Sequence, residues 1–147
     1  MARILVGGPG GEKSDIHDDL VSRLQQEHDV TYLKGDGQGM FLMLIKAPSM
    51  QKEQGYSLIL YDSNLFYPEV PADRKIKVFE ELTAKYLASA QVPVIVLAEM
   101  ELATKLRPSV EKAGFMQIDQ PYQVKEVLYN VKEILVTAAE NAAKKIC

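Results

Sequence analysis

The sequence has little cysteine. Its single cysteine, Cys147, is the last of 147 residues. One cysteine cannot form a disulfide within the chain, and it cannot supply the several thiolates of a metal cluster. Because chain termini fray, we expect Cys147 to be an exposed thiol in the tail rather than a catalytic nucleophile.

The chain also lacks a long apolar run and an excess of positive charge. No stretch approaches the roughly 20 apolar residues that cross a bilayer. The first residues, MARILVGG, have neither the charged region nor the cleavage site of a signal peptide. Lys and Arg number 17 against 20 Asp and Glu, which gives a net charge of -3, whereas nucleic-acid binding needs clustered cations. We therefore expect a cytoplasmic protein that binds neither membranes nor nucleic acids.

The remaining composition is that of an ordinary globular protein. The chain is 47% hydrophobic and 25% charged, and its length is enough to bury a core. No linker, internal repeat or low-complexity segment divides it. We predict one domain over residues 1–147.

Short apolar runs alternate with amphipathic segments along the chain. Strands are expected at residues 4–6, 30–33, 56–61, 92–97 and 115–118. The apolar spacing predicts helices at 15–28, 40–45, 73–90, 100–113 and 123–145. This alternation indicates parallel strands, right-handed crossovers and helices on both faces. We predict a doubly wound α/β domain with a five-stranded parallel sheet and an extended C-terminal helix.

Ligands of such sheets bind at the carboxyl ends of the strands. Five short segments follow the predicted strands: Gly7-Gly8, Lys34-Gly35, Asp62, Ala98-Glu99 and Asp119-Gln120. Because parallel strands end at the same edge, any chemistry is expected among these residues.

Several motifs occur in an order and spacing that is typical of one family. They are Asp36-Gly37, the strand LILYDSN, the strand VPVIVLAE, the helix end Ala113-Gly114, and Gln120-Pro121-Tyr122. Over residues 3–140 the chain resembles a response-regulator receiver (CheY-like) domain. The resemblance implies a flavodoxin-like fold with receiver topology and a place in two-component signalling. Receivers accept a phosphoryl group on an aspartate, with Mg²⁺ held by an acidic pair.

Two residues match the receiver site. By the resemblance, Asp62 holds the position of the phospho-acceptor, and Asn64 the position whose backbone carbonyl ligates the metal. A Mg²⁺ ion is expected only if this site is active, and no other cofactor is expected.

The other receiver positions depart from the family pattern. Gly7, Gly8 and Pro9 replace the acidic pair, Ala98 replaces the hydroxyl residue, Gln120 replaces the lysine, and Gln117 replaces the aromatic switch residue. Each such loss removes several kcal/mol of transition-state stabilisation. Glu12, Asp15 and Glu99 are the acids that could replace the pair, but their spacing gives no support for it. Without its partners, Asp62 is expected to solvate its charge at the strand end or to cap a backbone amide.

Two hypotheses follow from the resemblance. In the first, the chain is a pseudo-receiver, a signalling module that binds protein partners, is not an enzyme, and shows little or no phosphotransfer. In the second, it is a phosphorylatable receiver that uses Asp62 with an unusual metal site.

The glycine-rich loop after the first strand supports a third hypothesis. In GGPGGEKS, the residues Gly7, Lys13 and Ser14 fit the phosphate-binding pattern G-x-x-x-x-G-K-[ST], but Glu12 occupies the last glycine position. A nucleotide or another anion would then bind in the loop Gly7–Ser14, whose candidates are Gly7, Gly8, Gly10, Gly11, Lys13 and Ser14. The alternative is a simple turn.

The two histidines give no metal site. Asp15-Ile16-His17 matches part of the cobalamin motif D-x-H-x-x-G, but Leu20 replaces its glycine. We expect His17 to be a surface residue of its helix and His28 to lie at a helix end.

Two surfaces are candidates for partner binding. The run Met40–Ile45 is more apolar than one helix face requires, which suits either core packing or a partner. In receivers the fourth helix, fifth strand and fifth helix form the dimer and partner surface. Here that surface would carry Leu106, Tyr122, Lys125, Tyr129 and Lys132, and it would be the contact of a homodimer.

Overall fold

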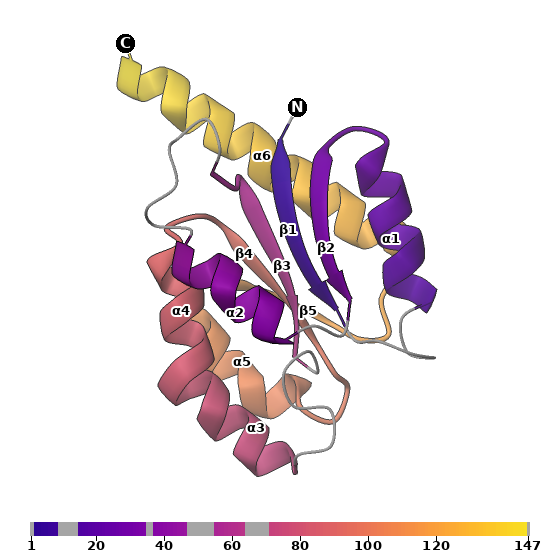
Figure 1. Cartoon of the computed structure of the whole chain (residues 1–147), viewed down its shortest axis with the longest axis vertical. Coiled ribbons are helices and arrows are strands. Elements are labelled where there is room, and N and C mark those ends of the chain that lie inside the picture. The colour runs from indigo at the N-terminus through magenta and orange to yellow at the C-terminus, as the bar shows by residue number, and fades with distance from the viewer. Residues whose placement is uncertain (1, 9–14, 35–36, 47–54, 64–70, 147) are drawn as a thin grey trace.

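A computed structural model describes residues 2–8, 15–34, 37–46, 55–63 and 71–146. All five strands pair in parallel in one sheet, with the order β2-β1-β3-β4-β5. The strands are β1 (Arg3–Gly8), β2 (Asp29–Lys34), β3 (Leu58–Asp62), β4 (Val94–Ala98) and β5 (Met116–Asp119). The predicted five-stranded parallel sheet of flavodoxin-like receiver topology is therefore confirmed (Figure 1).

The helices follow the strands as predicted, with shifted bounds. They are α1 (Asp15–Gln25), α2 (Gly37–Lys46), α3 (Ala72–Val78), α4 (Ala84–Ser89), α5 (Ala103–Lys112) and α6 (Val124–Ile146). The helix predicted at 73–90 is continuous, but a π-helical turn, η3 (Phe79–Thr83), separates α3 from α4. Hydrophobic spacing alone gives no sign of this turn, because it changes the hydrogen-bond pattern and not the apolar composition.

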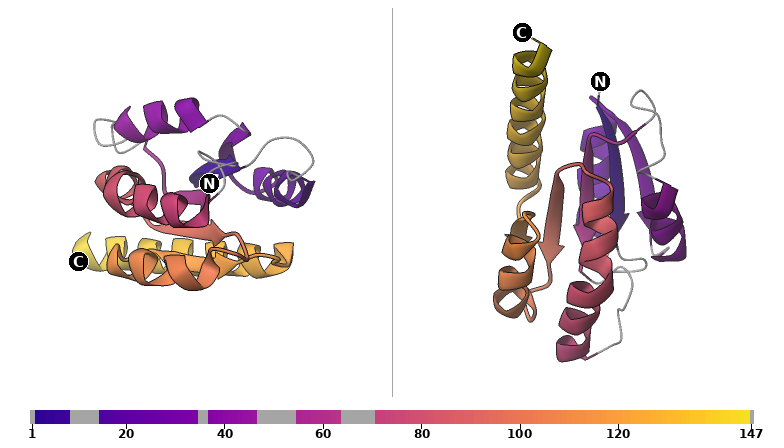
Figure 2. Two further views of the ribbon diagram at one scale, coloured as in Figure 1. Left: turned by 90° about the horizontal axis from the view of Figure 1, so that it is seen from below. Right: turned by 90° about the vertical axis from the view of Figure 1, so that its left-hand side faces the viewer.

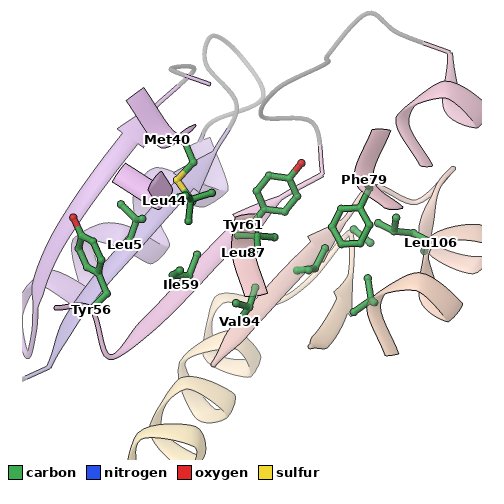
Figure 3. Close-up of a cluster of buried hydrophobic side chains, with 14 residues drawn as sticks. Leu5, Met40, Leu44, Tyr56, Ile59, Tyr61, Phe79, Leu87, Val94 and Leu106 are labelled. Carbon is green, nitrogen blue, oxygen red and sulfur yellow. The ribbon is translucent and has the colours of Figure 1, made fainter. Parts of the chain in front are cut away.

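Alternating side chains along each strand fill two separate cores. Leu5, Ile59 and Tyr61 pack with residues of α2, η3, α4 and α5 on one face (Figure 3). Ile4 and Val6 pack with residues of α1 and α6 on the other face. Because successive side chains of a strand point to opposite faces, an unbroken apolar run such as LILYD is the sequence of a strand covered on both sides.

Helix α5 ends at a glycine with a left-handed backbone. Gly114 has a φ of 81°. Its N–H donates to Glu111 O at 3.0 Å, and the N–H of Phe115 donates to Val110 O at 3.0 Å. These two bonds form a Schellman motif, which explains why the Ala113-Gly114 pair predicted a helix end.

Helix α6 extends past the edge of the sheet at which the strands begin (Figures 1 and 2). Its 23 residues agree closely with the predicted extended helix. Among the described helices, none has the length and apolarity that crossing a membrane requires.

Candidate functional site at the carboxyl edge of the sheet

The carboxyl edge of the sheet is built around Asp62, the last residue of β3. Its side chain is only 1% exposed. The prediction that Asp62 solvates its charge in water is therefore wrong, whereas the alternative that it caps a backbone amide stays a prediction. The strand ends at the sheet centre, between β1 and β4, where α1 and the segment after β5 cover the carboxylate.

His17 of α1 is the partner of Asp62. Its Nε2 lies 2.9 Å from Asp62 Oδ2, and its side chain is 2% exposed. The prediction that His17 lies on the helix surface is wrong. A signal for burial exists in the sequence, because His17 precedes Leu20 and Val21 by three and four residues and so belongs to the same helical stripe.

Tyr122 extends this pair into a chain of three buried groups. Its hydroxyl lies 2.9 Å from His17 Nδ1, and the two rings meet edge to face. Burial, and then the charge of Asp62, raise the pKa of Tyr122 above its ordinary value. The raised pKa keeps the phenol protonated, and its hydroxyl and His17 Nδ1 share one hydrogen bond.

Gly8, the last residue of β1, lies against His17 and Tyr32. A Cβ at this position would lie 3.5 Å from His17 Cγ, and also 3.5 Å from both Cε1 and the hydroxyl oxygen of Tyr32. The space beyond the end of β1 is therefore occupied by an imidazole and a phenol. In a receiver, the resemblance places the acidic pair at this strand end.

Beside His17, three more polar residues of this edge, Tyr32, Asp18 and Lys34, bind one another. Tyr32 donates to Asp18 Oδ1 at 3.1 Å, and Lys34 Nζ lies 3.0 Å from Asp18 Oδ2. Burial and the hydrogen bond to Asp18 raise the pKa of Tyr32. Lys34 is one of the strand-end residues where the sequence predicts chemistry, but nothing in the sequence points to Tyr32 or Asp18, because their meeting depends on how α1 packs against β2.

By the resemblance, Gln120 corresponds to the receiver lysine. Its backbone N–H donates to Ala98 O at 2.8 Å, which fixes the segment after β5 against β4. Its side-chain amide donates to Asp62 Oδ2. Oδ2 of Asp62 therefore contacts both His17 Nε2 and the side-chain amide of Gln120.

Polar side chains near the ends of β3, β4 and β5 also have hydrogen-bond or ion-pair partners. Ser63 Oγ accepts the N–H of Glu99 at 3.0 Å, and Lys75 Nζ lies 3.3 Å from Glu99 Oε2. Gln117 donates to Ala103 O at 2.8 Å. Glu99, one of the acids that could replace the missing pair, is thus bound to Lys75, while the side chains of Glu12 and Asp15 lie outside the described residues.

The described residues do not fit a Mg²⁺ site. Mg²⁺ requires several oxygen ligands in octahedral geometry. Gly7 and Gly8 offer no carboxylate, and the charged Asp62 is bound by His17 and Gln120. No group of three or more His, Cys, Asp or Glu in the described part of the chain could hold a metal ion. Pro9, Asn64 and the loop residues Gly10, Gly11, Lys13 and Ser14 lie outside that part.

The predicted partner surface is only partly exposed. Leu106 and Tyr122 are 2% and 5% exposed, so neither can contribute to an accessible surface. Lys125, Tyr129 and Lys132 are exposed, and they line a groove between α6 and α1 instead of facing α5.

The Met40–Ile45 run is only partly used in core packing, and its role in partner binding stays a prediction. Met40 and Leu44 are buried in the core, whereas Leu42 and Ile45 are 57% and 56% exposed. An amphipathic α2 thus leaves two large apolar side chains at the surface.

Comparison with known proteins agrees with the fold. No protein-family model matches the chain, and no curated protein matches its sequence. Among solved structures, the receiver domain of Francisella response regulator 1452 matches with a TM-score of 0.61 and 15% identity, covering 94% of this chain and 99% of that one. A streptococcal redox sensor, from a family that evolved from two-component response regulators, matches with a TM-score of 0.64 and 18% identity, covering 100% of this chain and 56% of that one.

A third neighbour contains the metal that receivers use. The receiver domain of the sensor histidine kinase PA1611 from Pseudomonas aeruginosa, with a magnesium ion coordinated in its active-site cleft, has a TM-score of 0.55 and 18% identity. The match covers 91% of this chain and 97% of that domain. The fold of the present chain is thus that of response-regulator receiver domains.

Proposed function

We propose that this chain is a pseudo-receiver: a signalling module of the two-component type that acts by binding protein partners, without phosphotransfer to Asp62. The observation that carries the proposal is the burial of the Asp62 carboxylate against the His17 imidazole at 2.9 Å. A phospho-acceptor must reach a phosphodonor in line, with a metal and a cation around the incoming oxygens.

Three features of the site support this proposal. First, the Asp62 side chain is 1% exposed, so an incoming phosphoryl group would have to displace His17. Second, glycines stand at the end of β1, where the resemblance places acids. Third, Gln120 carries no charge to stabilise phosphoryl oxygens, although it lies within hydrogen-bond distance of Asp62.

The arrangement also accounts for the stability of the altered site. A buried carboxylate without partners costs several kcal/mol. His17, Gln120 and, through His17, Tyr122 provide the hydrogen bonds that make burial possible. We infer that these residues replace the metal and the lysine as the groups that hold Asp62 in place.

An NMR titration with Mg²⁺ and then beryllofluoride, which mimics an aspartyl phosphate, tests the proposal. We expect no saturable shift in the amide signals of Gly7, Gly8, Asp62 and Ser63 at millimolar concentrations. The Pseudomonas receiver domain, whose cleft coordinates magnesium, serves as the positive control for metal binding. Saturable shifts that disappear in Asp62→Asn would instead establish a working acceptor.

A further inference from the structure

A groove of about 720 Å³ runs between the C-terminal part of α1 and the outer side of α6. Leu24, Leu128 and Leu135 contribute to its apolar lining, and His28 also lines it. The groove has no signature in the sequence, because α1 and α6 are far apart in the chain and meet only on the folded sheet. It is separate from the buried site around Asp62.

One line of residues on α6 borders the groove. Lys125, Tyr129, Lys132 and Val136 are spaced by four, three and four positions, so they share one side of the helix. Tyr129 is 64% exposed and Val136 46% exposed. Tyr129 and Val136 thus form an exposed apolar patch, and each of them lies next to a lysine. Such patches are typical of sites that bind a partner.

The charges of α6 are arranged so that two antiparallel copies of the helix would place lysines opposite glutamates. Glu133 and Glu140 are exposed and lie beside the lysine line. If two copies of α6 run antiparallel about an axis between Lys132 and Glu133, then Lys132 faces Glu133 of the partner subunit. The same axis places Tyr129 against Val136 of the partner subunit, and Lys125 against Glu140 of the partner subunit.

We propose that this face binds a second copy of the chain, with the α6 helices of the two copies antiparallel along the line from Lys125 to Val136, at the α6 side of the groove. A two-fold axis makes every contact occur twice, so the two lysine–glutamate pairings become four. A parallel arrangement in the same register would place lysine against lysine, which is repulsive. The charges therefore set the orientation, while burial of Tyr129 and Val136 supplies most of the affinity. The proposal holds whether or not Asp62 accepts a phosphoryl group.

Charge exchange across the axis tests the interface. Sedimentation equilibrium of the full chain is expected to show a concentration-dependent dimer. Lys132→Glu should weaken dimerisation by about tenfold, because attractive surface pairs become repulsive, and Glu133→Lys should do the same. The double variant Lys132→Glu/Glu133→Lys should restore the wild-type affinity. Lys85→Glu on α4, at another exposed helix position, is the matched control and should have no effect.

Cysteine cross-linking tests the direction of the helices, in a Cys147→Ser background. Lys125→Cys/Glu140→Cys should form a disulfide-linked dimer on mild oxidation, and each single variant should not. Fifteen residues of helix separate the two positions by about 20 Å, so they cannot link within one chain. A chain that remains monomeric at millimolar concentration, a double charge variant that stays as weak as the single ones, or cross-linking of the single variants would each overturn the proposal.

Discussion

His17 Nε2 lies 2.9 Å from Asp62 Oδ2, and both side chains are almost completely shielded from water. This contact joins the first helix to the central strand at the position where a receiver carries its reactive carboxylate. His17 and Gln120 thus contact the same oxygen of that carboxylate, Oδ2. Several properties of the protein are expected to depend on this one pair.

The first prediction concerns the stability of the pair. His17→Ala should lower the free energy of unfolding by about 3–5 kcal/mol, because it leaves a buried carboxylate with one donor fewer. Urea denaturation followed by circular dichroism measures the change. Arg23→Ala breaks the exposed Arg23–Asp19 pair of the same helix and should cost less than about 1 kcal/mol.

A double-mutant cycle separates the pair from the packing around it. Asp62→Asn keeps the shape of the side chain and removes its charge. If the pair is coupled, the loss in the double variant His17→Ala/Asp62→Asn should be smaller than the two single losses added together. Simple additivity would show that His17 acts only by filling space.

The second prediction concerns alkaline pH. Burial raises the pKa of Tyr122 and of Tyr32 above the ordinary value of about 10. The unfolded chain therefore loses these protons before the folded chain does. Stability from this source is fully present below pH 10 and is lost as the pH rises from about 10 toward the higher folded values.

Tyr122→Phe should flatten this alkaline loss, since the variant has one raised phenol fewer. At neutral pH it should cost about 1 kcal/mol, the usual contribution of one buried hydrogen bond. Unfolding free energies measured from pH 8 to pH 11 give both effects. An equally steep loss in Tyr122→Phe would contradict the assigned role of this phenol.

The third prediction concerns the space beyond β1. A Cβ at Gly8 meets its neighbours at 3.5 Å, which is an ordinary contact, so Gly8→Ala should be tolerated within about 1 kcal/mol. Gly8→Asp should cost about 2 kcal/mol or more, because it adds a carboxylate against His17 and Tyr32 near the charge of Asp62. Thermal unfolding of the two variants provides the comparison. Equal stability would mean that this space can open to water.

The fourth prediction concerns the end of α5. Gly114→Ala should lower the free energy of unfolding by about 1–2 kcal/mol, because a left-handed φ is strained for a residue with a Cβ. No atom lies within 4 Å of the added Cβ, so the cost is that of the backbone alone. Gly114→Asn should cost less, since asparagine tolerates this conformation. A loss of the same size in both variants would point to contacts rather than to backbone strain.

Much of the fold was readable from the sequence because it depends on local patterns. The unbroken apolar runs LILYD and VIVLA gave the central strands, and the Ala113-Gly114 pair gave a helix end. The order of the elements then left few topologies, since parallel crossovers are right-handed. The π-helical turn at Phe79–Thr83 was missed, because its cause is not visible in the apolar spacing.

The candidate site was readable only in part. Asp62 and Gln120 were placed at the carboxyl edge from the ends of their strands, but their contact was not foreseen. His17 was predicted to be exposed although its spacing from Leu20 placed it on the buried stripe. A polar side chain is readily buried once a partner satisfies its hydrogen bonds, so the helical periodicity of His17 is a better guide to its burial than its polarity.

By itself, the sequence determined the succession of strands and helices, the parallel sheet, and the residues at the strand ends, because each follows from local spacing and chain order. Only the tertiary structure decided that His17 meets both Asp62 and Tyr122, the latter 105 positions away in the chain. It also decided that Lys125, Tyr129 and Lys132 border α1 rather than α5. Such contacts depend on how helices pack across a sheet, and packing is set by the whole core rather than by any one segment.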